Sequence, residues 1–260
     1  FLFISTMSVG QTGVVASNAM VVSAREEASK IGVAILKKGG NAFDAMVATE
    51  LAWAVAYPYA GNIGGGGFMV YRKANGETGT LDYREKAPLA ATKNMFLDKD
   101  GKIIKGKSTE SPLSIGVPGT IAGVFAVHEK LGSLPMSEIM KPVIELAEKG
   151  VVVTKKQEKS LNTYREAIIK ANGNRTKFAT VFKENDTIKY PALAETLKRI
   201  AKNGKNEFYK GQTAGKLIRY FKQIGAIITK KDLAQYEAKW RNSLEFGYKN
   251  LKIISMAPPS

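Results

Sequence analysis

The chain has 260 residues, of which 44% are hydrophobic and 24% charged, so it can form one large domain and is composed like a globular protein rather than a disordered one. It has no Cys and a single His, His128, which excludes disulfides, thiol nucleophiles, iron–sulfur clusters and multi-His metal sites; we expect no metal and no cofactor. The net charge of +16 is concentrated in residues 154–260, which carry 23 basic and 9 acidic side chains, against 16 and 14 in residues 1–153.

The first residues, Phe1-Leu2-Phe3-Ile4, form a short apolar run that fades into small residues. This pattern is typical of the second half of a secretory signal peptide, and the run is too short to cross a bilayer. An ordinary buried strand is the alternative. We predict that residues 1–11 are a signal-peptide remnant or a disordered lead, which would make the protein periplasmic or secreted, and that residues 12–260 belong to one domain.

Two helices are predicted in the next part of the chain. After a short strand at residues 13–17, Ser23 and Glu26 have the spacing of a capping box, in which each side chain binds a free backbone N–H at the start of a helix. A second helix starts at Asn41 and runs to about residue 57. It is apolar nearly all round, interrupted mainly by Glu50, and is therefore expected to be buried.

The rest of the chain predicts a mixture of strands and helices. In order, these are a hairpin over residues 68–84, a mostly irregular stretch over 89–113, a helix from Pro118 to about Leu131, helices at 137–149, 155–171, 191–203 and 213–223, a short helix capped by Thr229 with Asp232, and strands near 243–247 and 251–256.

Four consecutive glycines, Gly64 to Gly67, precede the predicted hairpin. Without side chains, the backbone there can turn tightly or approach another group closely. No Gly-Lys-Ser/Thr follows, and Met69 stands where a dinucleotide fingerprint needs its third Gly, so a nucleotide site is poorly supported. The run is either an anion pocket lined by main-chain N–H groups or a structural turn.

Arg84 stands at the end of the second hairpin strand, shortly before Pro88, where the chain is expected to leave the sheet. A guanidinium at such a position can offer a two-pronged contact to a carboxylate. From its spacing alone, however, a surface position or an ion pair with Glu85 is favoured.

Other polar residues do not form a recognisable site. His128 has no partner nearby and is expected on a helix surface, and Glu145 and Glu148 have a spacing that is common on solvated helix faces. No Gly-x-Ser-x-Gly motif occurs. The basic second half leaves open a non-catalytic module that binds polyanions, although scattered lysines on helices more often form a solvated surface.

Seven ordered blocks carry a family resemblance when they are taken together. They are residues 36–45 (LKKGGNAFDA), 61–68 (GNIGGGGF), 82–88 (DYREKAP), 116–120 (GVPGT), 208–211 (FYKG), 228–233 (ITKKDL) and 258–260 (PPS). From about Val14 to Ser260, the chain resembles the gamma-glutamyltransferases, also called glutathione hydrolases.

The resemblance implies an α+β fold, part of the four-layer αββα arrangement of the N-terminal nucleophile hydrolases. In that family a precursor cleaves itself into a large and a small subunit. The new N-terminal Thr of the small subunit attacks the gamma-glutamyl carbonyl of glutathione or a related compound, with its own amine as base. Water, an amino acid or a peptide then accepts the gamma-glutamyl group.

By the same resemblance, Arg84 matches the large-subunit arginine that binds the α-carboxylate of the glutamyl group. The family's Thr-Thr-His motif does not occur, so the nucleophilic Thr is expected beyond Ser260, in a small subunit from the same precursor. The chain is therefore predicted to be a truncated large subunit that is inactive alone. A related acylase or a poly-gamma-glutamate processing enzyme is the alternative on this scaffold, and we expect no nucleic-acid partner and no membrane span.

Overall fold

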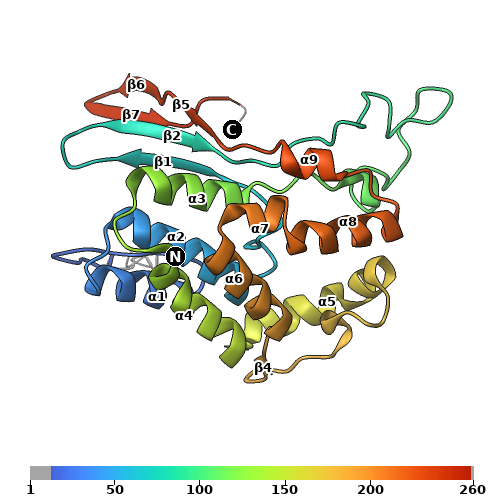
Figure 1. The fold of residues 1–260 in the computed structure, drawn as a ribbon, viewed down its shortest axis with the longest axis horizontal. Coiled ribbons are helices and arrows are strands. Elements are labelled where there is room, and N and C mark those ends of the chain that lie inside the picture. The colour runs from blue at the N-terminus through green and yellow to red at the C-terminus, as the bar shows by residue number, and fades with distance from the viewer. Residues whose placement is uncertain (1–12, 259–260) are drawn as a thin grey trace, which may run out of the picture.

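The computed structural model describes residues 13–258, so the predicted signal remnant at residues 1–11 lies outside the described residues. Figure 1 shows the longer strands gathered along one side of the molecule and helices packed beneath them. The predicted α+β class is confirmed. Of the predicted four layers, the described residues contain a sheet layer and the helices that cover one of its faces.

The two N-terminal helices are α1 (Glu26–Lys37) and α2 (Ala42–Ala56). The side chain of Asn41 accepts the N–H groups of Phe43 and Asp44, and Asp44 accepts the N–H of Asn41, so a reciprocal capping box starts α2. The predicted box at Ser23 is wrong. Arg25 is the N-cap of α1, and no side chain caps this helix end. The Ser23 hydroxyl bonds the Arg25 carbonyl and the Ser29 hydroxyl instead.

The remaining helices follow the predicted order, with the addition of α7. They are α3 (Thr120–Leu131), α4 (Met136–Lys149), α5 (Lys155–Asn172), α6 (Pro191–Asn203), α7 (Lys205–Tyr209), α8 (Gln212–Ile224) and α9 (Lys230–Ala234), with 3-10 turns at Pro112–Ser114 and Lys177–Ala179. The predicted cap at Thr229 is confirmed at α9, where Thr229 and Asp232 form a reciprocal capping box. None of the helices within residues 13–258 is long and apolar enough to span a bilayer.

Three antiparallel strands form the sheet that holds the candidate site. The predicted hairpin pairs β1 (Phe68–Arg72) with β2 (Thr78–Asp82), and β5 (Lys239–Arg241) adds to the other edge of β2 with Leu81 opposite Trp240. The predicted C-terminal strands form a separate hairpin of β6 (Leu244–Tyr248) and β7 (Leu251–Ser255). A short pair, β3 (Val151–Val152) and β4 (Thr187–Ile188), lies apart from both.

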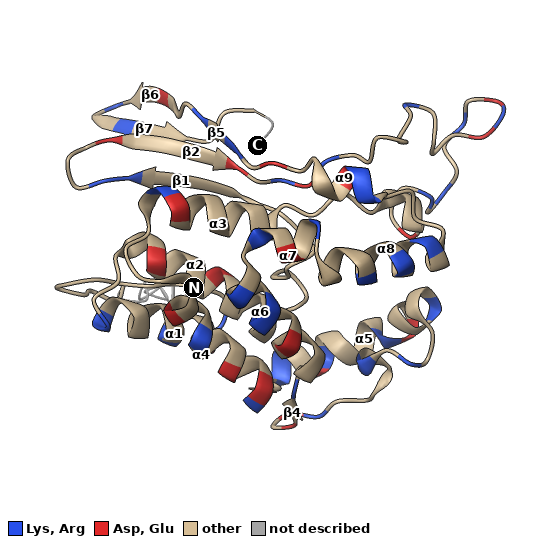
Figure 2. Ribbon diagram, in the orientation of Figure 1, with Lys and Arg blue, Asp and Glu red and all other residues tan. Residues whose placement is uncertain are grey.

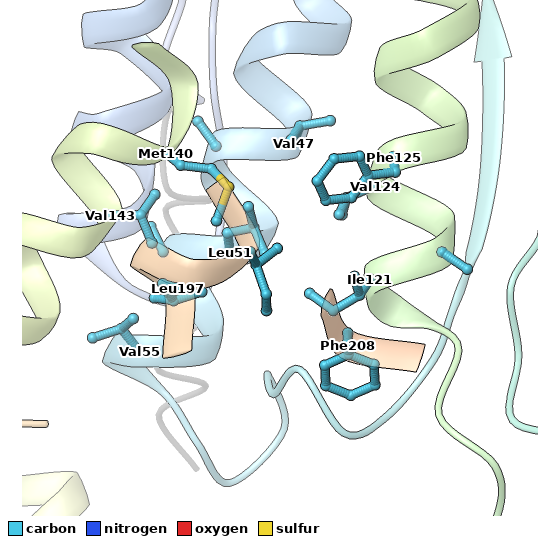
Figure 3. Packing of buried hydrophobic residues seen from close by; sticks show 14 of the residues in the cluster. Val47, Leu51, Val55, Ile121, Val124, Phe125, Met140, Val143, Leu197 and Phe208 are labelled. Atoms are coloured by element: carbon cyan, nitrogen blue, oxygen red, sulfur yellow. The ribbon is translucent and has the colours of Figure 1, made fainter. Parts of the chain in front are cut away.

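The hydrophobic core lies between the sheet and the helices. Figure 3 shows side chains from different helices lying together there, among them Leu51 of α2, Ile121 of α3, Met140 of α4 and Leu197 of α6, each at most 1% exposed. The prediction that α2 is buried on most faces is therefore confirmed. Close packing of this kind fixes the position of α2 and α3, and with them the loops that leave the sheet.

Several local predictions are wrong. Residues 13–17 form no strand, and Val15 is 93% exposed. The third helix begins at Thr120 rather than Pro118, because the Pro118 carbonyl is taken by the hydroxyl of Tyr209. The short helix α7 and strand β5 were not predicted, since five and three residues are too few to show a period.

Candidate functional site

Arg84 lies two residues after the end of β2, where the chain leaves the sheet. Its side chain is exposed, and its guanidinium carbon lies 6.0 Å from the ring centre of Phe68, the first residue of β1. The strand predicted to end at Arg84 therefore ends earlier, at Asp82.

Side chains hold both main-chain hydrogen-bonding groups of Arg84. Its N–H donates to Oδ1 of Asp82 at 3.1 Å, and its carbonyl accepts the hydroxyl of Tyr236 at 2.7 Å. The other oxygen of Asp82 accepts both Nε and an Nη of Arg241, at 2.9 and 2.8 Å. The backbone of Arg84 is consequently tied to residues more than 150 positions away in the chain.

The glycine run packs against the residues on either side of Arg84. Gly67 and Tyr83 exchange two backbone hydrogen bonds, and a Cβ at Gly66 would lie 2.4 Å from the Tyr83 carbonyl oxygen. The carbonyl of Gly65 accepts the N–H groups of Gly119 and Thr120 at the start of α3. None of the four glycines has a positive φ, and close approach of another backbone segment explains the residue type at Gly66.

A buried acid lies beneath this segment. The Tyr83 hydroxyl is 3.0 Å from Oε2 of Glu50, the acidic residue that interrupts the apolar helix α2. Burial raises the pKa of Glu50 to about 7, although the hydrogen bond from Tyr83 opposes the shift. Burial, followed by the charge of Glu50, holds the pKa of Tyr83 far above its usual range, so the phenol keeps its proton and donates.

The other polar candidates have structural contacts. His128 is half-buried, and its Nε2 lies 2.7 Å from the Leu134 carbonyl oxygen, a contact that fixes the turn after α3. Glu145 and Glu148 each form an ion pair with a lysine, as expected for a solvated helix face. These residues do not approach Arg84 closely enough to form a site with it in any contact that the structure records.

The basic residues of the second half do not converge on one element. Figure 2 shows Lys and Arg distributed over α5, α6, α8 and the connecting loops, with acidic residues among them. Several are paired, as Arg199 is with Glu207 and Arg241 with Asp82. This distribution is that of a solvated surface and gives no support to a polyanion-binding module.

A cavity of about 1000 Å³ lies away from Arg84, between the start of α1, the turn at residues 57–59 and α5. It is lined by Arg25, Tyr59 and Tyr164 among others, and neither Arg84 nor the glycine run contributes to its wall. Among residues 13–258, no group of three or more His, Asp or Glu side chains could hold a metal ion.

Sequence reasoning missed most of the residues around Arg84. Asp82 stands two residues before it, a spacing at which an Asp side chain can accept the backbone N–H, and this signal could have been used. Tyr236 and Arg241 gave no local signal, because their contacts with Arg84 and Asp82 span 152 and 159 residues.

Comparison with known proteins gives one consistent result. Residues 28–260 match the family model described as gamma-glutamyltranspeptidase. The chain is 44% identical to a glutathione hydrolase proenzyme of Pseudomonas sp. (strain A14) over 97% of its length and 41% identical to one of Escherichia coli over 94%, but it covers only 45% and 43% of those proteins. The chain thus spans less than half the length of these curated relatives.

Solved structures agree with the sequence comparison. The crystal structure of Helicobacter pylori gamma-glutamyltranspeptidase has a TM-score of 0.92 and 43% identity, and the match covers 96% of this chain and 72% of that one. A more distant neighbour is a cephalosporin acylase from Bacillus halodurans, with a TM-score of 0.75, 26% identity, and coverage of 95% and 49%.

Proposed function

Because the chain belongs to the gamma-glutamyltranspeptidase family, we propose that the full-length protein hydrolyses or transfers the gamma-glutamyl group of glutathione and related compounds. The observation that carries this proposal is the continuous family match over residues 28–260, which includes the glycine run and Arg84. The proposal concerns the whole protein, of which this chain is the part that carries Arg84.

We assign Arg84 to the α-carboxylate of the gamma-glutamyl group. A guanidinium can bind both oxygens of a carboxylate in one plane, which Lys cannot do. The firmly held backbone of Arg84 supports this role, because a guanidinium fork that extends from a fixed backbone can be aligned with a carboxylate in one plane. The carboxylate would be held at the far end of the substrate from the scissile amide.

The reaction itself needs a nucleophile outside this chain. We propose that the N-terminal Thr of a small subunit attacks the gamma-carbonyl carbon while its own amine takes the hydroxyl proton. The amide C–N bond then breaks, the leaving amine receives that proton, and a gamma-glutamyl ester remains on the Thr. Attack by water or by an acceptor amine releases glutamate or a new gamma-glutamyl compound and restores the Thr hydroxyl.

The partner that completes the enzyme is the rest of the same precursor. The relatives are named as proenzymes, and they are more than twice as long as the matched region. In this chain the β6–β7 hairpin exposes Phe246, Tyr248 and Leu251 by 51 to 59%. Such a run of apolar side chains on a two-stranded hairpin calls for a covering surface, which we assign to the remainder of the precursor.

An acylase of the same architecture is the second candidate, since a cephalosporin acylase is among the structural neighbours. The two are distinguished by substrate: a gamma-glutamyl enzyme needs the free α-carboxylate, and an acylase acting on other side chains does not. We further propose that the protein acts in the periplasm or outside the cell. Fractionation of cells carrying the full-length gene tests this, and recovery of the protein solely from the cytosol would contradict it.

The test of the proposed function is kinetic and uses the full-length protein. Arg84→Ala should lower kcat/KM for a chromogenic gamma-glutamyl amide on the order of a hundredfold, mainly by raising KM, because each charge-assisted bond contributes roughly 1.5–3 kcal/mol. Arg84→Lys should recover only part of the loss. Subunit cleavage seen on a gel serves as the control for folding, and near-normal kinetics of Arg84→Ala would overturn the assignment.

A further inference from the structure

We propose that Tyr236 and Arg241 are positioning residues for Arg84, because they fix its main-chain carbonyl and, through Asp82, its main-chain N–H. The inference rests on the proposed role of Arg84 in binding a carboxylate. It deepens that role by assigning the orientation of the guanidinium to a second, distant segment of the chain.

The carbonyl side is held by Tyr236, which follows α9. Its hydroxyl donates to the Arg84 carbonyl at 2.7 Å, and the residue is only 8% exposed. Burial, together with the charges of Asp82 and Glu85, holds the pKa of this phenol above its usual range. The hydroxyl consequently keeps its proton and remains a donor to the carbonyl.

The ring of Tyr236 is itself held in place. It stacks on Tyr209 with 5.7 Å between ring centres and 7° between their planes. A Cβ at Gly119 would lie 2.2 Å from the Tyr236 hydroxyl oxygen and 1.9 Å from the Tyr83 carbonyl oxygen, so the hydroxyl can reach Arg84 because residue 119 has no side chain. This contact accounts for Gly119, the second glycine of the GVPGT block.

The N–H side is held through an ion pair. Oδ1 of Asp82 accepts the Arg84 N–H, and Oδ2 accepts two N–H groups of Arg241 on β5. The Asp82 side chain is only 11% exposed, so its charge has little water to stabilise it. Arg241 neutralises that charge and fixes the carboxylate rotamer in which the second oxygen points to Arg84.

Both contacts therefore hold the backbone of Arg84, from which its side chain extends. A guanidinium binds two carboxylate oxygens only when the fork and the carboxylate are coplanar, and small displacements of a binding group can lower a rate strongly. If Tyr236 and Arg241 had a purely structural role, their loss would affect all substrates alike. If they position Arg84, their loss affects the recognition of the α-carboxylate.

The experiment measures that recognition in the full-length enzyme. A chromogenic gamma-glutamyl amide is compared with the same compound in which the α-carboxylate is converted to an α-carboxamide, and the preference is the ratio of their kcat/KM values. Arg84→Ala should abolish the preference. Tyr236→Phe and Arg241→Lys should each lower it about 2- to 10-fold, mostly through KM of the carboxylate substrate, as expected for one lost hydrogen bond.

Matched controls exist elsewhere in the chain. Tyr71→Phe removes the hydroxyl of another buried tyrosine on the same sheet, one that faces Glu77 at 3.5 Å. Arg199→Lys changes another arginine paired with a carboxylate, that of Glu207. Neither touches Arg84 in any contact the structure records, and both should leave the preference at its wild-type value.

The outcomes separate the two proposals. A preference that survives Arg84→Ala overturns the proposed role of Arg84. A preference that is lost in Arg84→Ala but unchanged in both Tyr236→Phe and Arg241→Lys overturns the positioning role alone, as does an equal loss of activity on both substrates. If Arg241→Lys fails to mature, Tyr236→Phe decides, since it removes one oxygen atom and leaves the ring stack.

Discussion

Two neighbouring strand regions differ in how completely this chain holds them. The segment from β2 to Leu89 is fixed from several directions: Leu81 is fully buried, both main-chain groups of Arg84 are bound, and the Leu89 N–H donates to Asp232 at 2.6 Å. The β6–β7 hairpin has the same strand length, yet Phe246 and Leu251 are 51 and 56% exposed.

The two regions are in contact, which makes the difference informative. The Thr78 hydroxyl donates to Oε1 of Glu245 at 2.7 Å, so the hairpin begins where β2 begins. The segment that carries Arg84 is completed by residues of this chain, whereas the hairpin presents apolar side chains that the described residues 13–258 leave exposed. We infer that the carboxylate-binding element is built within the chain and that the hairpin is a docking surface for the rest of the precursor.

The largest expected effect concerns activity. If the Arg84 segment is complete but the nucleophile lies elsewhere, residues 1–260 produced alone should show no turnover of a chromogenic gamma-glutamyl amide, while the full-length protein does. The measurement is release of the chromophore against a buffer control. Turnover by the isolated chain would show that it holds a nucleophile of its own.

The next effect concerns packing in the two regions. In the isolated chain, Leu81→Ala should lower the free energy of unfolding by about 2–5 kcal/mol, because a fully buried leucine is removed from the core. Phe246→Ala should change it by less than about 0.5 kcal/mol, as for an exposed side chain. Urea unfolding followed by circular dichroism measures the free energy of unfolding of both variants. An equal loss in both would contradict the difference in packing between the two regions.

A smaller effect is expected from Glu50, which supports the Arg84 segment through Tyr83. Its pKa is raised from 4.5 to about 7 on folding. Between these values the folded state retains a proton that the unfolded state has released, so this contribution is complete below pH 4.5 and is lost as the pH rises to about 7. The change is at most about 3 kcal/mol.

The difference in unfolding free energy between wild type and Glu50→Gln isolates this contribution, because other titrating groups cancel. As the pH rises from 4.5 to 7.5, we expect the wild type to lose unfolding free energy relative to Glu50→Gln. Above pH 7.5 the difference between the two proteins should stay constant. A difference that is flat with pH would mean that Glu50 does not carry a raised pKa.

The smallest effect is expected at the hairpin surface. The isolated chain should bind a hydrophobic dye, because exposed apolar side chains gather on β6 and β7. Replacing Phe246 and Tyr248 by Ser should lower the fluorescence, and replacing Tyr164, an equally exposed tyrosine on α5, should lower it less. Equal decreases would mean that the hairpin is not a distinct apolar surface.

The sequence predicts elements whose signal is local. The Asn41–Asp44 and Thr229–Asp232 capping boxes are within four residues, and the long helices have a clear apolar period. The box at Ser23 fails because the same hydroxyl has competing partners, the Arg25 carbonyl and the Ser29 hydroxyl six residues further on. Strand β5 is three residues long, and its pairing with β2 is a long-range contact that no local pattern announces.

The same limit applies to the candidate site. The residues around Arg84 predict that it lies near the end of a strand. Its proposed role comes from the family resemblance, since its spacing alone favours a surface residue. The close approaches at Gly66 and Gly119 involve backbone atoms from other parts of the fold. Arg241 reaches the site through the pairing of β5 with β2, and Tyr236 follows α9, which packs against α7 and α8.

Amide hydrogen exchange, compared between the isolated chain and the full-length protein, tests the central claim most directly. We predict that the amides of residues 80–84 exchange at similar slow rates in both, because this chain completes their contacts. The amides of residues 244–255 should be protected at least about tenfold more in the full-length protein, if the rest of the precursor covers the hairpin as proposed. Equal exchange of the hairpin in both proteins, or strong new protection at residues 80–84, would contradict the account.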